Sequence, residues 1–179
     1  MTSFPHQYVD INILGSADEI QFAWRYDRNM ITNASNQSVD TDTSIPCVLV
    51  LICDDELHAR EALKSLLTIY TLSKSDDTIP QIKVVGMAAN GQEAIQRVAE
   101  YHPDVVLMDA LMPVMDGFEA TRIIKSRWPQ VKVVMLTMYS AQQSAAMAAG
   151  VDAFLLKGCP AEELLDTILP TYKTDFGHG

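Results

Sequence analysis

Residues 105–117 read Val-Val-Leu-Met-Asp-Ala-Leu-Met-Pro-Val-Met-Asp-Gly. An apolar run typical of a buried strand ends in one carboxylate, Asp109, and a proline-containing loop then leads to Asp116-Gly117, which opens a helix. In an open parallel sheet, ligands bind beyond the carboxyl ends of the strands. A carboxylate at such a position faces a ligand, although an ordinary strand-end loop residue looks the same in the sequence. Other stretches of the chain decide between these two interpretations.

From residue 45 to residue 170 the sequence alternates between strand and helix patterns. Continuous apolar runs predict strands that are buried on both faces, and segments with helical spacing of apolar residues separate them. Five such β-α units predict an α/β fold, a doubly wound five-stranded parallel sheet of order 2-1-3-4-5 with helices on both faces, as in flavodoxin-like proteins. The predicted strands are 47–53, 82–88, 105–108, 131–136 and 153–156. The later helices are expected over 118–128, 141–149 and 160–169, and a polar loop is expected over 71–81.

The first 44 residues differ in pattern from the rest. Two segments of alternating apolar and polar residues predict a β-hairpin. A helix that begins at Ser16, with Glu19 completing a capping box, is the alternative. The expected organisation is an N-terminal extension over 1–44, with the hairpin at 8–26 and a polar linker at 32–44, then one domain over 45–170 and a C-terminal tail over 171–179.

Composition and charge exclude several classes of protein. The net charge is −10 and the chain has no cluster of Lys and Arg, which argues against direct binding of nucleic acid. The longest apolar run, residues 47–53, is too short to span a membrane, and the N-terminus lacks the pattern of a signal peptide. Three cysteines, Cys47, Cys53 and Cys159, show no disulfide pattern. These features indicate a cytoplasmic protein.

Polar side chains follow four of the five predicted strands. Because the order 2-1-3-4-5 makes the first and third strands neighbours, Asp54, Asp55 and Asp109 are expected to crowd one crevice, where their repulsion favours a bound cation. Mg²⁺ prefers a few carboxylate oxygens together with water. Beside such a metal, an Asp can act as the nucleophile of phosphoryl transfer, while Thr137 and Lys157 can donate to phosphoryl oxygens. Each residue also has an ordinary role as a helix cap, strand residue or surface amine, but their joint placement favours a site.

Residues 47–169 resemble the receiver domain of two-component response regulators. Residues 118–122 and 154–158 are most similar to receivers of LuxR-type regulators. The motifs that carry the resemblance are Asp54-Asp55, the segment Met-Asp-Ala-Leu-Met-Pro at 108–113, Asp116-Gly117, Thr137 and Lys157.

The resemblance implies a phosphorelay switch rather than an enzyme. By this resemblance, Asp109 is expected to accept a phosphoryl group from the phosphohistidine of a sensor histidine kinase or phosphotransfer protein. Mg²⁺ is implied as cofactor, bound by Asp55 and Asp109, by Asp54 through water, and by the backbone carbonyl of Leu111.

The resemblance also implies how the switch responds. Thr137 moves to the phosphoryl group, Phe154 turns inward, and the face made by the fourth helix, the fifth strand and the last helix changes shape. The sequence departs from the family pattern in two places, with Phe154 where Tyr is more frequent and Gly158 where many receivers have Pro. Only residues 158–179 follow Lys157, too few for a helix-turn-helix output domain. A stand-alone receiver that acts on an unknown partner protein is therefore expected, or the receiver half of a truncated transcription regulator.

Two alternatives share the expected topology. A pseudo-receiver would bind partners without phosphorylation, but no acidic, Thr or Lys position is lost here. A flavin binder would need a phosphate cradle after the first strand, where the carboxylates of residues 54–56 would instead repel a phosphate. The methionines, including Met108 and Met135, are expected to fill the core. A homodimer is a further expectation, and membrane binding is not expected.

Overall fold

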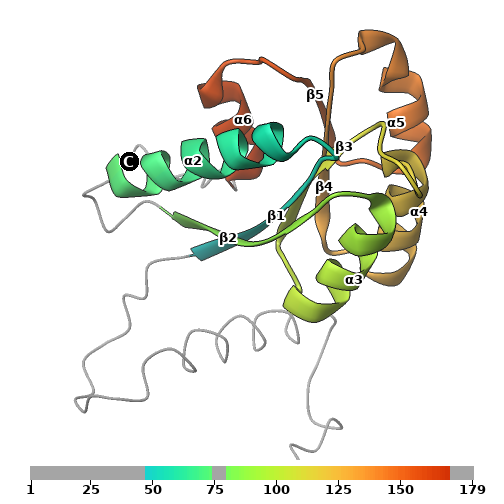
Figure 1. Ribbon diagram of the computed structural model, residues 1–179, viewed down its shortest axis with the longest axis horizontal. Coiled ribbons are helices and arrows are strands. Elements are labelled where there is room, and N and C mark those ends of the chain that lie inside the picture. Colours follow the sequence, from blue (N-terminus) through green and yellow to red (C-terminus); the bar gives the residue numbers. More distant parts are fainter. Residues whose placement is uncertain (1–46, 74–79, 170–179) are drawn as a thin grey trace, which may run out of the picture. The chain divides into compact units, whose positions relative to one another are not determined.

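The computed structural model describes residues 47–73 and 80–169, which form a five-stranded parallel sheet between two layers of helices (Figure 1). The strand order β2-β1-β3-β4-β5 confirms the predicted topology. The expected hairpin, linker and tail lie outside the described residues and stay predictions. The elements are β1 (Cys47–Cys53), α2 (Leu57–Ser73), β2 (Gln81–Ala88), α3 (Gly91–Tyr101), β3 (Val105–Asp109), α4 (Gly117–Arg127), β4 (Lys132–Thr137), η2 (Ser140–Gln142), α5 (Gln143–Ala149), β5 (Ala153–Leu156) and α6 (Ala161–Ile168).

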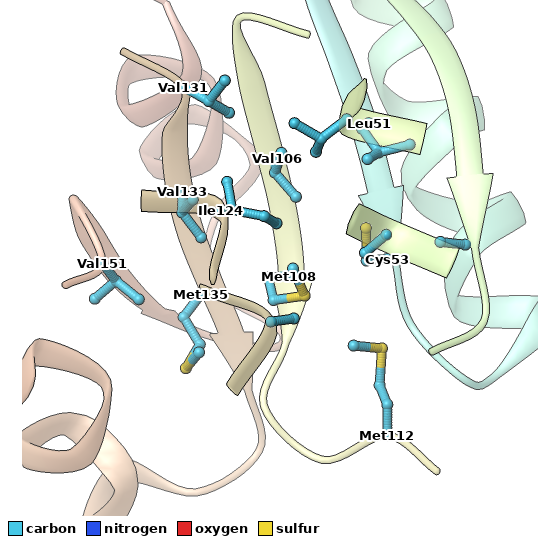
Figure 2. Packing of buried hydrophobic residues seen from close by; sticks show 14 of the residues in the cluster. Leu51, Cys53, Val106, Met108, Met112, Ile124, Val131, Val133, Met135 and Val151 are labelled. Atoms are coloured by element: carbon cyan, nitrogen blue, oxygen red, sulfur yellow. The ribbon is translucent and has the colours of Figure 1, made fainter. Parts of the chain in front are cut away.

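The sheet is apolar on both faces, so the core consists of two clusters. Successive strand residues point to opposite faces. On one face Leu51, Met108 and Met135 pack with residues of α3, α4 and α5 (Figure 2). On the other face Val50 and Leu107 pack with residues of α2 and α6. The two methionines are fully buried, which confirms that they fill the core.

α2 extends further than the sequence predicts. The polar loop expected over 71–81 is wrong at its start, because α2 continues to Ser73. Thr71 explains the difference. Its hydroxyl oxygen lies 3.1 Å from the Leu67 carbonyl oxygen and 3.0 Å from the Ile82 carbonyl oxygen, either of which can accept its one hydrogen. The same oxygen accepts from the Ile82 N–H at 3.2 Å. A polar residue at this position therefore ties α2 to β2 and does not begin a loop.

The helix expected over 141–149 begins with a different geometry. Residues of η2 form a single 3₁₀ turn, and the α-helix α5 starts only at Gln143. The Gln142 N–H donates to the Tyr139 carbonyl at 3.1 Å, which closes this turn. The sequence predicted the helix, and the structure adds a tighter first turn next to the end of β4.

At the edge of the sheet where β4 and β5 begin, one lysine joins three segments. Lys125 of α4 donates from Nζ to the carbonyls of Pro129 and Val131, at 2.9 and 3.0 Å, and pairs with Asp152 at 2.9 Å. Asp152 in turn accepts from the Val133 N–H at 2.7 Å. The end of α4, the start of β4 and the turn before β5 are therefore held together.

Among the helices of residues 47–73 and 80–169, none is long and apolar enough to cross a membrane. Cys47, Cys53 and Cys159 are free thiols. Cys47 and Cys53 stand at the two ends of β1, as the sequence predicted.

Gly117, the first residue of α4, lies against the end of β3. Its N–H donates to the Ala110 carbonyl at 3.0 Å, and a Cβ at this position would collide with the Asp109 carbonyl oxygen. We expect Gly117→Ala to lower the free energy of unfolding by about 3 kcal/mol, because the strand end would have to move. Urea denaturation would measure the change.

Gly158→Ala is the matched control. Gly158 has a φ of 91°, but a Cβ added to it would meet no other atom within 4 Å. Its substitution should therefore cost only about 1 kcal/mol, from the left-handed backbone alone. Equal losses in the two variants would contradict the steric role of Gly117.

Candidate functional site

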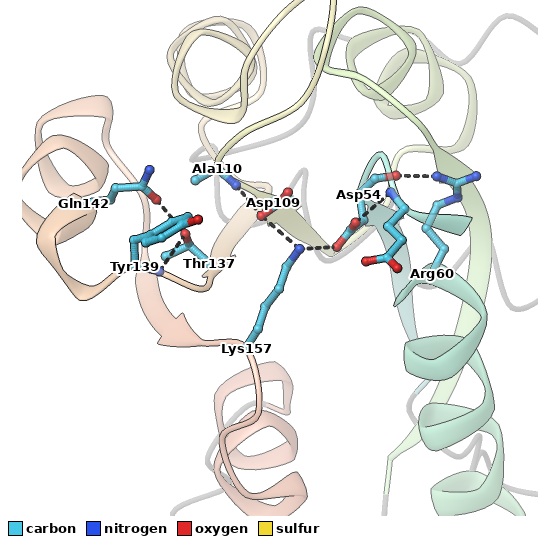
Figure 3. A network of polar contacts seen from close by, with 9 residues as sticks. Asp54, Arg60, Asp109, Ala110, Thr137, Tyr139, Gln142 and Lys157 are labelled. Atoms are coloured by element: carbon cyan, nitrogen blue, oxygen red, sulfur yellow. Dashed lines mark hydrogen bonds and ion pairs between the residues drawn. The ribbon is translucent and has the colours of Figure 1, made fainter. Parts of the chain in front are cut away.

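The carboxyl ends of the strands bring the predicted polar residues together (Figure 3). In the parallel ladders Cys53 pairs with Met108, and Thr137 pairs with Leu156. The residues that follow in the chain therefore lie along the same edge of the sheet, where ligands of doubly wound sheets bind. This edge carries Asp54, Asp55, Asp109, Thr137 and Lys157.

Three carboxylates gather between the ends of β1 and β3. Asp54, Asp55 and Asp109 each offer an oxygen atom, and these atoms lie within 4.8 Å of one another. Asp54 and Asp109 are buried, with 2% and 7% of their surface exposed, whereas Asp55 is exposed. Carboxylates this close repel one another unless positive charge lies among them. The oxygen donors suit a hard metal cation, and the exposed side of the cluster leaves room for its water ligands.

Lys157 supplies positive charge from within the protein. Its Nζ lies 2.7 Å from Asp54 Oδ2 and 3.1 Å from Asp109 Oδ1. The side chain is 24% exposed, so this lysine is not an ordinary surface amine. One ammonium balances one of the three carboxylates, and the cluster therefore still favours a further cation.

The electrostatics of Asp109 fit a reactive carboxylate. Burial raises the pKa of the Asp109 carboxyl above its usual value, the Lys157 ammonium acts against this rise, and the Asp54 carboxylate adds to it. The Ala110 N–H donates to Asp109 Oδ1 at 2.9 Å and stabilises the anion. Burial disfavours the charged form of Lys157, but the two carboxylates outweigh it and the pKa of Lys157 is raised. The Asp109 carboxylate is therefore buried but stays paired with Lys157 and with the Ala110 N–H.

Asp54 has both roles that the sequence allows, since it caps the chain before α2 and also belongs to the site. Its Oδ1 accepts from the Glu56 N–H at 3.0 Å, a local turn just before α2, while Oδ2 pairs with Lys157. Arg60, in the first turns of α2, donates from Nη1 to the Asp54 carbonyl oxygen. Sequence reasoning missed Arg60, because a donor to a backbone carbonyl carries no motif. Leu111, whose carbonyl is implied as a metal ligand, follows on the loop after β3, and that role stays a prediction.

Thr137 has a hydrogen-bond partner that the sequence did not suggest. The residue is 1% exposed, and its hydroxyl donates to Gln142 Oε1 at 2.5 Å. The hydroxyl oxygen of Thr137 also accepts from the Tyr139 N–H at 3.3 Å. Phe154, the other residue assigned to the switch, is half-buried on β5 and packs against the cluster that contains Met135.

A family model, the response regulator receiver domain, matches residues 50–169. The chain therefore belongs to the response regulator receiver domain family and serves in two-component signalling, as the resemblance predicted.

Relatives agree with this assignment. Response regulator protein VraR of Staphylococcus epidermidis is 39% identical over 128 residues, which make up 70% of this chain and 57% of that protein. The chain thus spans little more than half the length of this relative. Two solved structures have TM-scores of 0.56: a LuxR-family DNA-binding response regulator from Staphylococcus aureus, at 28% identity over 68% of this chain and 95% of that chain, and the response regulator domain of Thermotoga maritima CheB, at 30% identity over 68% and 93%.

The Lys157 ion pairs predict a measurable contribution to stability. Lys157→Met should lower the free energy of unfolding by about 2 kcal/mol at neutral pH without divalent metal, because two buried carboxylates lose their partner. Adding Asp109→Asn to this variant should recover part of the loss by removing one of the repelling charges. Urea denaturation at low salt would measure all three proteins.

Lys64→Met is the control for a general effect of losing a lysine. Lys64 pairs with Glu61 at 4.0 Å, and both side chains are about half exposed. Its loss should change the stability by less than about 0.5 kcal/mol. If Lys64→Met lowers the free energy of unfolding as much as Lys157→Met, the buried ion pairs of Lys157 contribute no more to stability than an exposed ion pair.

Proposed function

We propose that Asp109 accepts a phosphoryl group from the phosphohistidine of a sensor histidine kinase or a phosphotransfer protein, in a reaction that needs Mg²⁺. The observation that carries the proposal is the joint position of Asp54, Asp55, Asp109 and Lys157 at one edge of the sheet. A buried carboxylate that is flanked by two others and by an ammonium has the charges that phosphoryl transfer to an aspartate requires. A histidine kinase is the partner that membership of the family implies.

The transfer exchanges one bond for another. A carboxylate oxygen of Asp109 forms an O–P bond while the P–N bond of the phosphohistidine breaks. The electron pair of that bond stays on the leaving imidazole, which is neutral when its other ring nitrogen carries a proton. Both the acceptor and the phosphoryl group are negatively charged, so positive charge between them lowers the barrier. Lys157 Nζ, 3.1 Å from Asp109 Oδ1, provides one such charge.

The acidic cluster suits Mg²⁺ as the second charge. Mg²⁺ takes few carboxylate ligands and keeps several waters, which fits two buried carboxylates next to an exposed one. When bound, the ion neutralises charge between the carboxylate and the phosphoryl oxygens. Asp55 and Asp109 would hold it directly and Asp54 through water, and we include the Leu111 carbonyl as a further ligand.

The phosphoryl acceptor is a side chain of the protein itself. Each molecule therefore takes one phosphoryl group as an aspartyl phosphate, and we class the protein as a phosphoprotein switch and not as an enzyme. A cytoplasmic location belongs to the proposal, since the free thiols of Cys47, Cys53 and Cys159 persist in a reducing compartment.

The proposed output is the face made by α5, β5 and α6. Thr137 and Phe154 connect the phosphorylation site to this face, and a change in their arrangement would shift it between two states. Met147 of α5 and Leu156 of β5 are exposed apolar residues there, 55% and 42% accessible, which suits a protein partner or a second copy of the chain. The net charge of −10 argues that this chain does not itself bind nucleic acid.

A second candidate is a receiver that forms one part of a longer transcription regulator. It is favoured by the VraR relative, of which the chain covers 57%, and by the Staphylococcus aureus neighbour, which is a DNA-binding response regulator. The phosphorylation chemistry is the same in both candidates. A pseudo-receiver without phosphorylation is the alternative that the next experiment addresses.

Intact-mass analysis after incubation with a small acyl phosphate tests the proposal. The wild type should gain one phosphoryl group in the presence of Mg²⁺ and none in its absence. Asp109→Asn should gain none, because the acceptor carboxylate is gone. Asp166→Asn, which removes an exposed aspartate of α6, is the control and should behave as the wild type. No added mass on the wild type under any condition would favour the pseudo-receiver.

A further inference from the structure

We propose that Gln142 is a positioning residue that holds the Thr137 hydroxyl in the unphosphorylated protein and thereby sets how readily the site accepts a phosphoryl group. The inference rests on the proposed function, because it concerns the competition between Gln142 and the phosphoryl group for one hydrogen atom. Figure 3 shows Gln142 and Lys157 on opposite sides of Thr137 and Asp109.

The hydrogen-bonding capacity of Thr137 is limited. A hydroxyl has one hydrogen to donate and two lone pairs to accept with. The hydrogen of Thr137 is directed to Gln142 Oε1 at 2.5 Å, the short end of the range for such bonds, and one lone pair accepts from the Tyr139 N–H. Thr137 is 1% exposed, so water cannot readily replace a lost partner.

A phosphoryl group on Asp109 would compete for this hydrogen. The strands β3 and β4 are neighbours, and Asp109 pairs with Leu136. Thr137 is the next residue of β4, so it lies beside Asp109 at the same edge of the sheet. Phosphoryl oxygens only accept hydrogen bonds, and the hydroxyl has only one hydrogen. Donation to the phosphoryl group therefore requires that the Thr137–Gln142 bond breaks. Gln142 is half-buried, so its amide can turn to water once released.

The same bond links the site to the proposed output face. Gln142 is the last residue of η2, and α5 starts at the next residue. Its N–H is held by the Tyr139 carbonyl, while Tyr139 N–H is held by the Thr137 hydroxyl. Release of the Gln142 side chain therefore loosens the turn that begins α5.

Thermodynamic linkage gives the expected effect of removing the amide. The Thr137–Gln142 bond exists only in the unphosphorylated arrangement, so its loss destabilises that arrangement alone. In the described part of the wild-type chain, every buried side-chain polar atom has a hydrogen-bond partner. Gln142→Ala would leave the Thr137 hydroxyl without an acceptor for its hydrogen. We expect the variant to bind a phosphoryl mimic about fivefold more tightly, the size of one neutral hydrogen bond.

The probe is beryllofluoride with Mg²⁺, titrated into the ¹⁵N-labelled chain of residues 1–179 and followed by NMR. Gln142→Ala should bind about fivefold more tightly than the wild type. Gln143→Ala is the matched control, because Gln143 is an exposed glutamine next in the chain, and its affinity should stay within about twofold. Gln142→Glu keeps an acceptor for the Thr137 hydroxyl and gives it a negative charge, which strengthens the hydrogen bond. This variant should therefore bind beryllofluoride more weakly than the wild type.

A double-mutant cycle with Thr137→Val separates positioning from a general structural effect. In the Thr137→Val background, Gln142→Ala should leave the affinity unchanged, because the hydroxyl that it releases is absent. In the wild type, saturation with the mimic should shift the side-chain amide signals of Gln142.

The outcomes distinguish two failures. If the wild type binds no mimic, the proposed function and this inference both fall. If the wild type binds it and Asp109→Asn does not, the proposed function stands. In that case an unchanged or weaker affinity of Gln142→Ala, or an equal gain in the Thr137→Val background, would overturn the role of Gln142 alone.

Discussion

Two carboxylates, Asp54 and Asp109, are buried at the end of an apolar sheet, and the rest of the site depends on the ammonium that both of them share. An unpaired charge in such a place costs several kcal/mol. The strand order makes the sharing possible, because β1 and β3 are neighbours and β5 ends within reach of both. The same order leaves the cluster with an excess of negative charge. The strand order that pairs the two buried carboxylates with Lys157 therefore also makes the cluster attract a cation.

Much of this was readable in the sequence, because the apolar runs end abruptly in polar residues. The strand β3 is buried along its whole length, and it has no reason to stop at Asp109 unless the sheet ends there. The carboxyl ends of β1 and β3 follow from such abrupt changes, and the parallel topology then brings the strand ends to one edge. Family likeness adds the chemistry of the site, but the juxtaposition comes from the pattern of strands and helices.

The contacts that escaped sequence analysis share a physical property. The Thr71 hydroxyl hydrogen-bonds to the backbone of β2, Arg60 donates to the backbone of Asp54, and Gln142 accepts from a hydroxyl five residues away. Each depends on where a side chain reaches after folding, and neither periodicity nor residue type encodes that reach. The register shift between β1 and β2, at Val50 and Leu51, belongs to the same class. Such details follow from tertiary packing and need coordinates.

The ion pair between Lys125 and Asp152 gives the proposed output face a fixed end. It holds the start of β4 and the turn between α5 and β5, close to Gly150. The other end of α5 is joined to Thr137 through η2. If the proposed switch moves α5 as a rigid body about this fixed end, the displacement would be largest at Gln143 and smallest at Ala149. A partner that contacts the Tyr139 end would therefore bind differently in the two states of the switch. A partner that contacts only the Gly150 end would bind almost equally well in both.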